Sequence, residues 1–189
     1  MSIQKVSDKM LADTGTMPAW DGSALTGISG GKLLQLAYTT STFGSTTASS
    51  SNGVYVDTSV NITFTPTTTA SKFLVFFRIG AVVQNDPDDF GWSYRIKKTQ
   101  SSTDTNPSGL DEWIGSGGNH AHKYIYENAI TNWNNYQQAD NFWGVDADAH
   151  TTASITYTVQ LAQTNAGTNL RVGNENNVRP QMIVQEISN

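Results

Sequence analysis

The chain has 189 residues, no cysteine and a formal net charge of -5, and only 14% of its residues are charged. This length suffices for one domain with its own hydrophobic core, and disulfide or thiolate chemistry is excluded. Thr, Ser, Asn and Gln supply the polarity. This argues against nucleic acid or an anionic membrane as partner, because both attract clustered Lys and Arg. The first twenty residues contain no apolar run, so neither a signal peptide nor membrane insertion is expected.

Residues 1–32 are predicted to form an extended N-terminal arm. Pro18 and four glycines interrupt regular structure there, and the apolar residues are too sparse for a core. One interpretation is a leader without fixed structure. The other is an anchor that docks into another protein or a neighbouring subunit through Trp20, Leu25 and Ile28. The globular domain is expected to span residues 33–189.

From residue 33 onwards the apolar pattern indicates β-strands. Strands are predicted at 33–40, 54–56, 60–65, 72–83, 91–98, 113–114, 123–130, 151–163, 168–172 and 180–188. The range 72–83 is the most apolar, and its Val, Ile and Phe residues favour a central strand covered on both faces. A turn signal at 86–89 predicts a hairpin between this strand and 91–98. Residues 132–149 give no clear assignment.

The last predicted strand alternates clearly, with Met182, Val184 and Glu186 on one side and Ile183, Gln185 and Ile187 on the other. A strand in this position has to pair within a sheet, because it would otherwise leave a sticky edge. No convincing helix is present beyond one N-terminal turn. The spacing of roughly eight strands predicts an all-β sandwich.

Aromatic residues gather in the middle of the chain, and four of them are candidate glycan contacts: Trp113, Trp133, Tyr136 and Trp143. Aromatic rings stack on sugars, and the Asn and Gln residues around Trp133 could bond sugar hydroxyls. The alternative is that these rings fill the core or a subunit interface, where Trp and Tyr are also enriched.

Signals for metals and catalysis are weak. His120 and His122 would point to one side of a strand and could bind zinc with His150 or a carboxylate, although His pairs in Gly-rich loops are usually solvated. The Asp clusters at 86–89 and 140–148 lack the spacing of a calcium loop. No nucleophile elbow, zinc-protease or phosphate-binding motif occurs. We therefore expect no cofactor, no metal, no catalytic residue and no enzymatic activity.

Several short segments together resemble structural proteins of tailed bacteriophages, of the kind described as tail-fibre or virion proteins. The segments are 25–28, 30–35, 62–67, 71–75 and 183–187. Such domains are similar to the trimeric jelly rolls of the complement and tumour-necrosis type. The resemblance implies a jelly-roll β-sandwich of about eight strands that assembles as a homotrimer. Residues 99–149 depart from the pattern, so no surface chemistry is carried over for them.

The expected function is that of a structural protein of a phage particle, made in the host cytoplasm and released by lysis. The arm would anchor a homotrimer to capsid or tail proteins, and the β-sandwich would be displayed as a capsid decoration or a short fibre. The alternative is a tail-fibre tip or adhesin that binds a host surface glycan.

Overall fold

The structure is a computed structural model, and its description covers residues 32–39, 46–47, 54–84, 90–110, 113–114, 120–121, 123–127, 136–163, 171–172 and 180–188. The chain divides into two units, Met1–Gly30 and Gly31–Asn189. All described residues belong to the second unit. The predicted anchor residues Trp20, Leu25 and Ile28 lie outside them, and the predicted arm stays a prediction.

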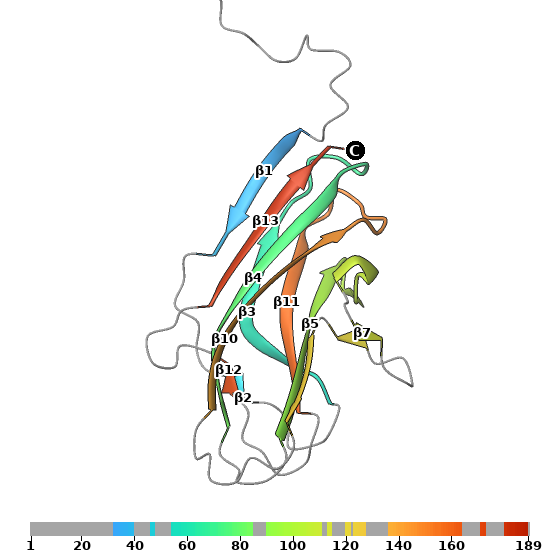
Figure 1. The fold of residues 1–189 in the computed structure, drawn as a ribbon. Coiled ribbons are helices and arrows are strands. Elements are labelled where there is room, and N and C mark those ends of the chain that lie inside the picture. Colours follow the sequence, from blue (N-terminus) through green and yellow to red (C-terminus); the bar gives the residue numbers. More distant parts are fainter. Residues whose placement is uncertain are drawn as a thin grey trace, which may run out of the picture. The chain divides into compact units, whose positions relative to one another are not determined.

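The described part of the chain is all-β, with two antiparallel sheets packed face to face (Figure 1). Sheet A contains, in spatial order, β1 (Leu33–Tyr38), β13 (Gln181–Ile187), β4 (Lys72–Gln84) and β10 (Tyr136–Asp146). Sheet B contains, in spatial order, β3 (Val56–Phe64), β11 (Ile155–Gln163), β5 (Phe90–Gln100) and β9 (Lys123–Glu127).

Short strands extend this frame. On sheet A, β4 also pairs with β12 (Arg171–Val172), which in turn pairs with β2 (Thr46–Thr47). On sheet B, the end of β5 pairs with β6 (Thr103–Thr105). A separate pair consists of β7 (Trp113–Ile114) and β8 (His120–Ala121).

The order of the eight principal strands is that of a jelly roll. Numbered one to eight along the chain, they read 1-8-3-6 in sheet A and 2-7-4-5 in sheet B. The first four strands therefore alternate between the two sheets along the chain. Two Greek keys folded into a double sheet give this order. The predicted β-sandwich of about eight strands is confirmed.

Two expectations about individual strands are wrong. The predicted hairpin between 72–83 and 91–98 does not form, because β4 lies in sheet A and β5 in sheet B. A turn signal in the sequence is compatible with a crossover between sheets as well as with a hairpin. The segments 54–56 and 60–65 belong to one strand, β3, whose register shifts where it pairs with β11.

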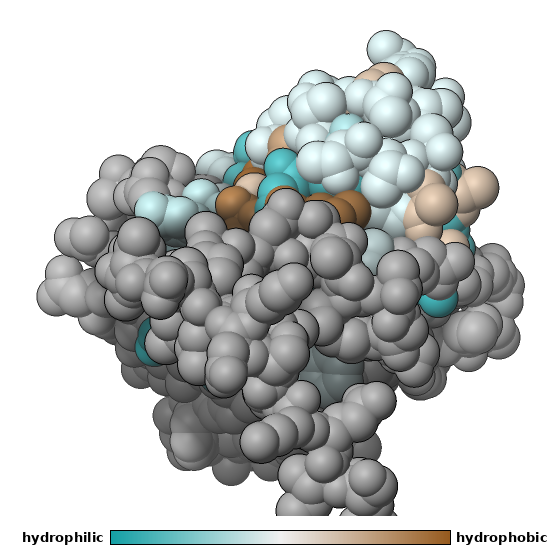
Figure 2. Space-filling view, turned by 90° about the horizontal axis from the view of Figure 1, so that it is seen from above, coloured by the Kyte–Doolittle hydropathy of each residue, from teal (hydrophilic) through white to brown (hydrophobic). Residues whose placement is uncertain are grey.

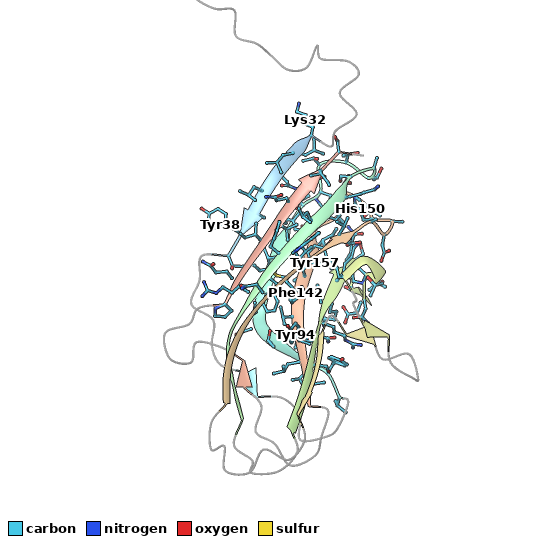
Figure 3. The ribbon with its side chains drawn as sticks, in the orientation of Figure 1. Lys32, Tyr38, Tyr94, Phe142, His150 and Tyr157 are labelled. Atoms are coloured by element: carbon cyan, nitrogen blue, oxygen red, sulfur yellow. The ribbon has the colours of Figure 1, made fainter. Side chains whose placement is uncertain are left out.

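The core is made by the inward-facing residues of both sheets, which alternate with outward-facing ones. In β4 the buried positions are Phe73, Val75 and Phe77, and β11 buries Ile155, Tyr157, Val159 and Leu161. Rings interlock across the interior, as the stacked pair Tyr94–Phe142 shows at 5.4 Å (Figure 3). Burying each large apolar side chain contributes about 1.5–3 kcal/mol, so these rows hold the two sheets together.

The edge of β10 that faces away from β4 is approached by a short 3₁₀ turn, Ser108–Leu110. The turn buries Leu110 in the core and brings Gly109 against Gly144 and Val145. A Cβ at Gly109 would overlap the carbonyl oxygen of Val145, so only glycine fits there. This contact explains why β10 carries a glycine at an inward position.

Candidate interaction surface

The side chains of sheet A that point away from the core form two apolar rows across all four principal strands. One row contains Leu36, Gln185, Leu74 and Val145, and the next contains Tyr38, Ile183, Phe76 and Trp143. We call these eight residues the apolar face. Trp143 is 65% exposed, Tyr38 63% and Leu36 52%. Tyr38 points away from the sandwich in Figure 3.

The apolar face has polar ends. Arg78 lies beside Gln181 on one neighbouring strand and beside Asn141 on the other, which places all three in the row next to Phe76. At the opposite end, Lys72 lies beside Ile187. The three polar residues at the first end, together with Phe76, Ile183 and Trp143, line a hollow of about 240 Å³. A contiguous apolar patch with a polar border is typical of a binding surface.

The outer face of sheet B carries polar side chains that bond one another across strands. Lys97 Nζ lies 2.6 Å from Asp57 Oδ2 and 3.3 Å from Asp104 Oδ2. Gln160 accepts from Arg95 Nε at 2.7 Å and donates to Asp57 Oδ1 at 2.7 Å. Partial burial by itself lowers the pKa of Lys97, but the two carboxylates outweigh it and raise that pKa. The polar side chains of this face thus satisfy one another across the strands.

The part of the domain seen from above also has a hydropathy close to neutral. In that view the described residues are mostly pale, the colour of hydropathy close to neutral (Figure 2). Such a surface agrees with a chain that is rich in Thr and Ser and poor in charge.

Glu186, on the inward side of β13, is fully buried and joins three segments of the chain. Its carboxylate accepts hydrogen bonds from Ser71 Oγ at 2.6 Å, from Thr67 N at 2.9 Å and from Gln35 Nε2 at 2.6 Å. Burial by itself raises the pKa of Glu186, but these hydrogen bonds outweigh it and lower that pKa. The ionised carboxylate thereby ties β1 and the β3–β4 connection to β13.

A second buried polar group links the two sheets. Lys98 of β5 is 3% exposed and Asp146 of β10 is 0% exposed, and Lys98 Nζ lies 2.9 Å from Asp146 Oδ2. The hydroxyl of Tyr157 donates to the same oxygen, and the backbone N–H of Asp148 donates to Asp146 Oδ1 at 3.0 Å. Burial, together with the charge of Asp146, raises the pKa of Tyr157 far above its usual value, so its phenol stays protonated.

Ser71 and His150 lie close enough to suggest a nucleophile and its base, but their hydrogen bonds oppose that role. His150 Nε2 is 3.0 Å from the carbonyl oxygen of Thr68, so this nitrogen carries a proton and donates it. It cannot also accept the proton of Ser71, 3.3 Å away. Ser71 instead donates to Glu186. The arrangement is a structural cluster and offers no general base.

The predicted glycan contacts are not brought together among the described residues. Trp143 is exposed on the apolar face, whereas Trp133 lies outside the described residues. For Trp113, in β7, and Tyr136, at the start of β10, the description covers the backbone alone. A contact role for Trp113, Trp133 and Tyr136 stays a prediction, and the exposed ring of Trp143 is available for contact.

The candidate metal ligands are only partly described by the structure. His120 begins β8, His122 lies outside the described residues, and the ring of His150 packs on Phe73 at 4.6 Å. Within the described ranges, no group of three His, Asp or Glu side chains could hold a metal ion. The same part of the chain contains no helix long and apolar enough to cross a membrane.

Sequence reasoning missed the buried charges. Lys98 follows Tyr94 and Ile96 at strand spacing, so its inward direction was readable from the alternation. Asp146 had no such signal, since its strand was not assigned. Glu186 was placed on the side of Met182 and Val184, yet its complete burial depends on partners from β1 and the β3–β4 connection.

Comparison with known proteins identifies no family. No known family and no curated protein matches the sequence. A solved structure of a CocE/NonD family hydrolase from Staphylococcus aureus is similar over 82% of this chain and 33% of that chain, with 11% identity and a TM-score of 0.36. The chain thus spans about a third of the length of that protein. A likeness this weak carries no inference about function and does not establish enzymatic activity.

Proposed function

We propose that this protein is a homotrimeric structural protein of a phage particle whose subunits associate through the apolar face of sheet A. The observation that carries the association is the pair of apolar rows, with Trp143 and Tyr38 each more than half exposed. Leaving such rings in water forfeits the free energy of burial, about 25 cal/mol per Å². A partner that covers the face recovers it.

A second copy of the chain is the partner that suits this face best. Its residues in the two rows are uncharged, as in the cores of homomeric interfaces, where charged residues are depleted. Its rows cross four strands, so the same rows on three subunits could gather around a common axis. The number of three subunits, the phage particle and the anchoring role of residues 1–32 rest on the sequence resemblance.

The decisive first experiment measures the mass of the native full-length chain by light scattering over a range of protomer concentrations. The proposal expects a trimer, and Phe76→Asp should dissociate it, since a carboxylate would be buried in the interface. Thr63→Asp on the outer face of sheet B is the matched control and should leave the trimer intact. A monomeric native protein at all concentrations would contradict the proposed association.

The role in a particle requires a separate test. Antibody against this domain, applied to purified phage particles and visualised with gold, should label the head if the protein decorates the capsid or forms a head fibre. Label confined to the tail would make it an adsorption protein. Particles without any label would contradict the virion assignment, whatever the oligomeric state.

Glycan binding is the second candidate, and one observation favours it. The exposed ring of Trp143 lies at a hollow bordered by Arg78, Asn141 and Gln181, and an aromatic ring with amide and guanidinium groups around it suits a sugar. Quenching of tryptophan fluorescence by host polysaccharide would test this. Trp143→Ala should abolish quenching without changing the native mass. If the variant dissociates instead, the ring belongs to the subunit interface.

A further inference from the structure

We propose that Lys98 and Asp146 condense to an intramolecular amide, a covalent cross-link between the two sheets of the sandwich. The side chains come from β5 in sheet B and β10 in sheet A, and their reacting groups lie 2.9 Å apart. Both residues are buried and fixed by long strands. The product is an isopeptide bond between Lys98 Nζ and Asp146 Cγ, formed with the loss of one water molecule.

The environment favours the neutral product over the ion pair. Among the described residues, no group accepts a well-aligned hydrogen bond from the Lys98 ammonium, although its nitrogen is buried. The ring of Phe73 is a further neighbour, with its centre 6.0 Å from Nζ. A buried charge with unsatisfied donors is costly. Condensation removes both charges and replaces three ammonium donors with a single amide N–H.

Proximity supplies the driving force for the reaction. Free amines and carboxylates do not condense in neutral water, because both ions are well solvated and the large excess of water favours hydrolysis. Two groups held in contact by a folded structure react with effective molarities of about 10⁵–10⁸ M. The interior also excludes the water that would reverse the reaction.

Each proton transfer in the condensation involves a group that lies beside Asp146. Lys98 transfers one proton to Asp146 Oδ2, which leaves a neutral amine and a neutral carboxylic acid. The amine lone pair attacks Cγ, and the negative charge that develops on Oδ1 is stabilised by the N–H of Asp148. Tyr157 gives its proton to Oδ2 and receives one from the attacking nitrogen. The Cγ–Oδ2 bond breaks, water leaves, and Tyr157 regains its starting state.

The cross-link joins the two sheets covalently, whereas the packing between them is otherwise non-covalent. It closes the chain between residues 98 and 146, the range that contains the 3₁₀ turn, β7, β8 and β9. A link of this length restricts the unfolded chain, as a disulfide does. The chain contains no cysteine, so a disulfide cannot perform this function.

Mass spectrometry of the purified full-length protein under denaturing conditions tests the proposal directly. We expect a mass lower than that of the sequence, with or without Met1, by one water. Digestion with trypsin should then yield a branched peptide that joins the segment of Lys98 to that of Asp146. A full-sequence mass would overturn the proposal and leave an ordinary ion pair. Loss of water mapped to Asp21–Gly22, where a succinimide can form, would overturn it as well.

Three variants sharpen the test. Lys98→Arg keeps the positive charge but should restore the full mass. Lys97→Arg, which changes the adjacent lysine on the outer face, should keep the loss of water and serves as the matched control. Tyr157→Phe keeps the buried ring and should leave a large fraction of the chain unlinked. Complete linkage in Tyr157→Phe would refute the proton relay while leaving the bond itself established by the wild-type peptide map.

Discussion

The outer faces of the two sheets follow the same backbone geometry but differ in chemistry. On sheet B, cross-strand neighbours satisfy one another, as Thr63 and Thr156 do with hydroxyl oxygens 2.8 Å apart and as Lys97 does with Asp57. On sheet A, most of the equivalent positions hold aromatic and aliphatic residues, of which Leu36, Tyr38 and Trp143 are each more than half exposed. The polar side chains of one face bond one another, whereas the other face exposes apolar side chains to water.

This difference indicates which part of the described surface is a candidate for binding. Both sheets bury one face equally well, so the core does not distinguish them. The distinction lies in the outward residues of β1, β13, β4 and β10, which contribute little to the stability of an isolated subunit. The proposed association of subunits would account for them. Mutations in the interior, on the apolar face and on the polar face should accordingly have separable effects.

The largest expected difference in stability is between a variant in the interior and a variant on the outer face of sheet B. Lys98→Met leaves Asp146 buried without either a cation or the proposed cross-link, and should destabilise the fold by about 3–5 kcal/mol. Lys97→Met removes a partly exposed ion pair and should cost at most about 1 kcal/mol. Unfolding in urea, at one protomer concentration for all proteins, measures both. Equal losses in the two variants would mean that the buried pair does not hold the sheets together.

The next effect concerns the two outer faces themselves. Trp143→Ala on the apolar face should weaken subunit association by about 2 kcal/mol or more, the usual effect of truncating a central aromatic residue in an interface. Thr156→Ala on the polar face should leave association unchanged. Analytical ultracentrifugation of dilution series reports both. An unchanged assembly in Trp143→Ala, with sugar binding lost, would reassign the ring to the glycan site.

A smaller effect concerns the inward side of sheet A, where Glu186 holds β1 in place. Its pKa in the folded protein is below its usual value of 4.5, so the unfolded chain binds the proton more tightly. The stabilisation is therefore fully present above pH 4.5 and is lost as the pH falls towards the lowered pKa. Melting temperatures measured from pH 7 to pH 3 should fall, and Glu186→Gln should flatten that decline. A decline of equal slope in the variant would assign it to other groups.

The smallest effect is expected on the polar face. Asp57→Asn removes the charge partner of Lys97 and should change stability by about 0.2–1 kcal/mol at low salt. At high ionic strength the difference between variant and wild type should shrink, because exposed charges are screened. Urea unfolding at two salt concentrations checks this. A difference that persists in high salt would show that the hydrogen bonds of this network outweigh its charges.

The sequence predicted most of the strands because the alternation of apolar and polar side chains can be read from adjacent residues. In β13 the buried Met182 and Val184 alternate with the more exposed Gln181, Ile183 and Gln185, and the burial pattern follows this alternation. The strand β10 escaped prediction because two of its inward positions are Gly144 and Asp146. Gly144 faces inward because the 3₁₀ turn approaches it closely, and Asp146 because Lys98 pairs with it. Both reasons involve residues distant in the sequence.

The candidate sites were predicted less well. Trp143 was singled out for its type, and the structure places it on the apolar face beside Phe76. The face itself could not be foreseen, because its rows combine residues from four strands spread from β1 to β13. The pairing of β4 with β10 and β13 also replaced the expected hairpin with β5, and local turn signals cannot reveal such a change of sheet.

What the sequence determined by itself is the all-β class, the number of principal strands and the direction of most side chains along each strand. These are local properties, set by alternation and by turn residues. The tertiary structure decided which strands are neighbours, which outward rows meet to form the apolar face, and how Lys98, Asp146 and Tyr157 come together. These depend on contacts between distant segments, where the burial of two sheets against each other selects one pairing from many.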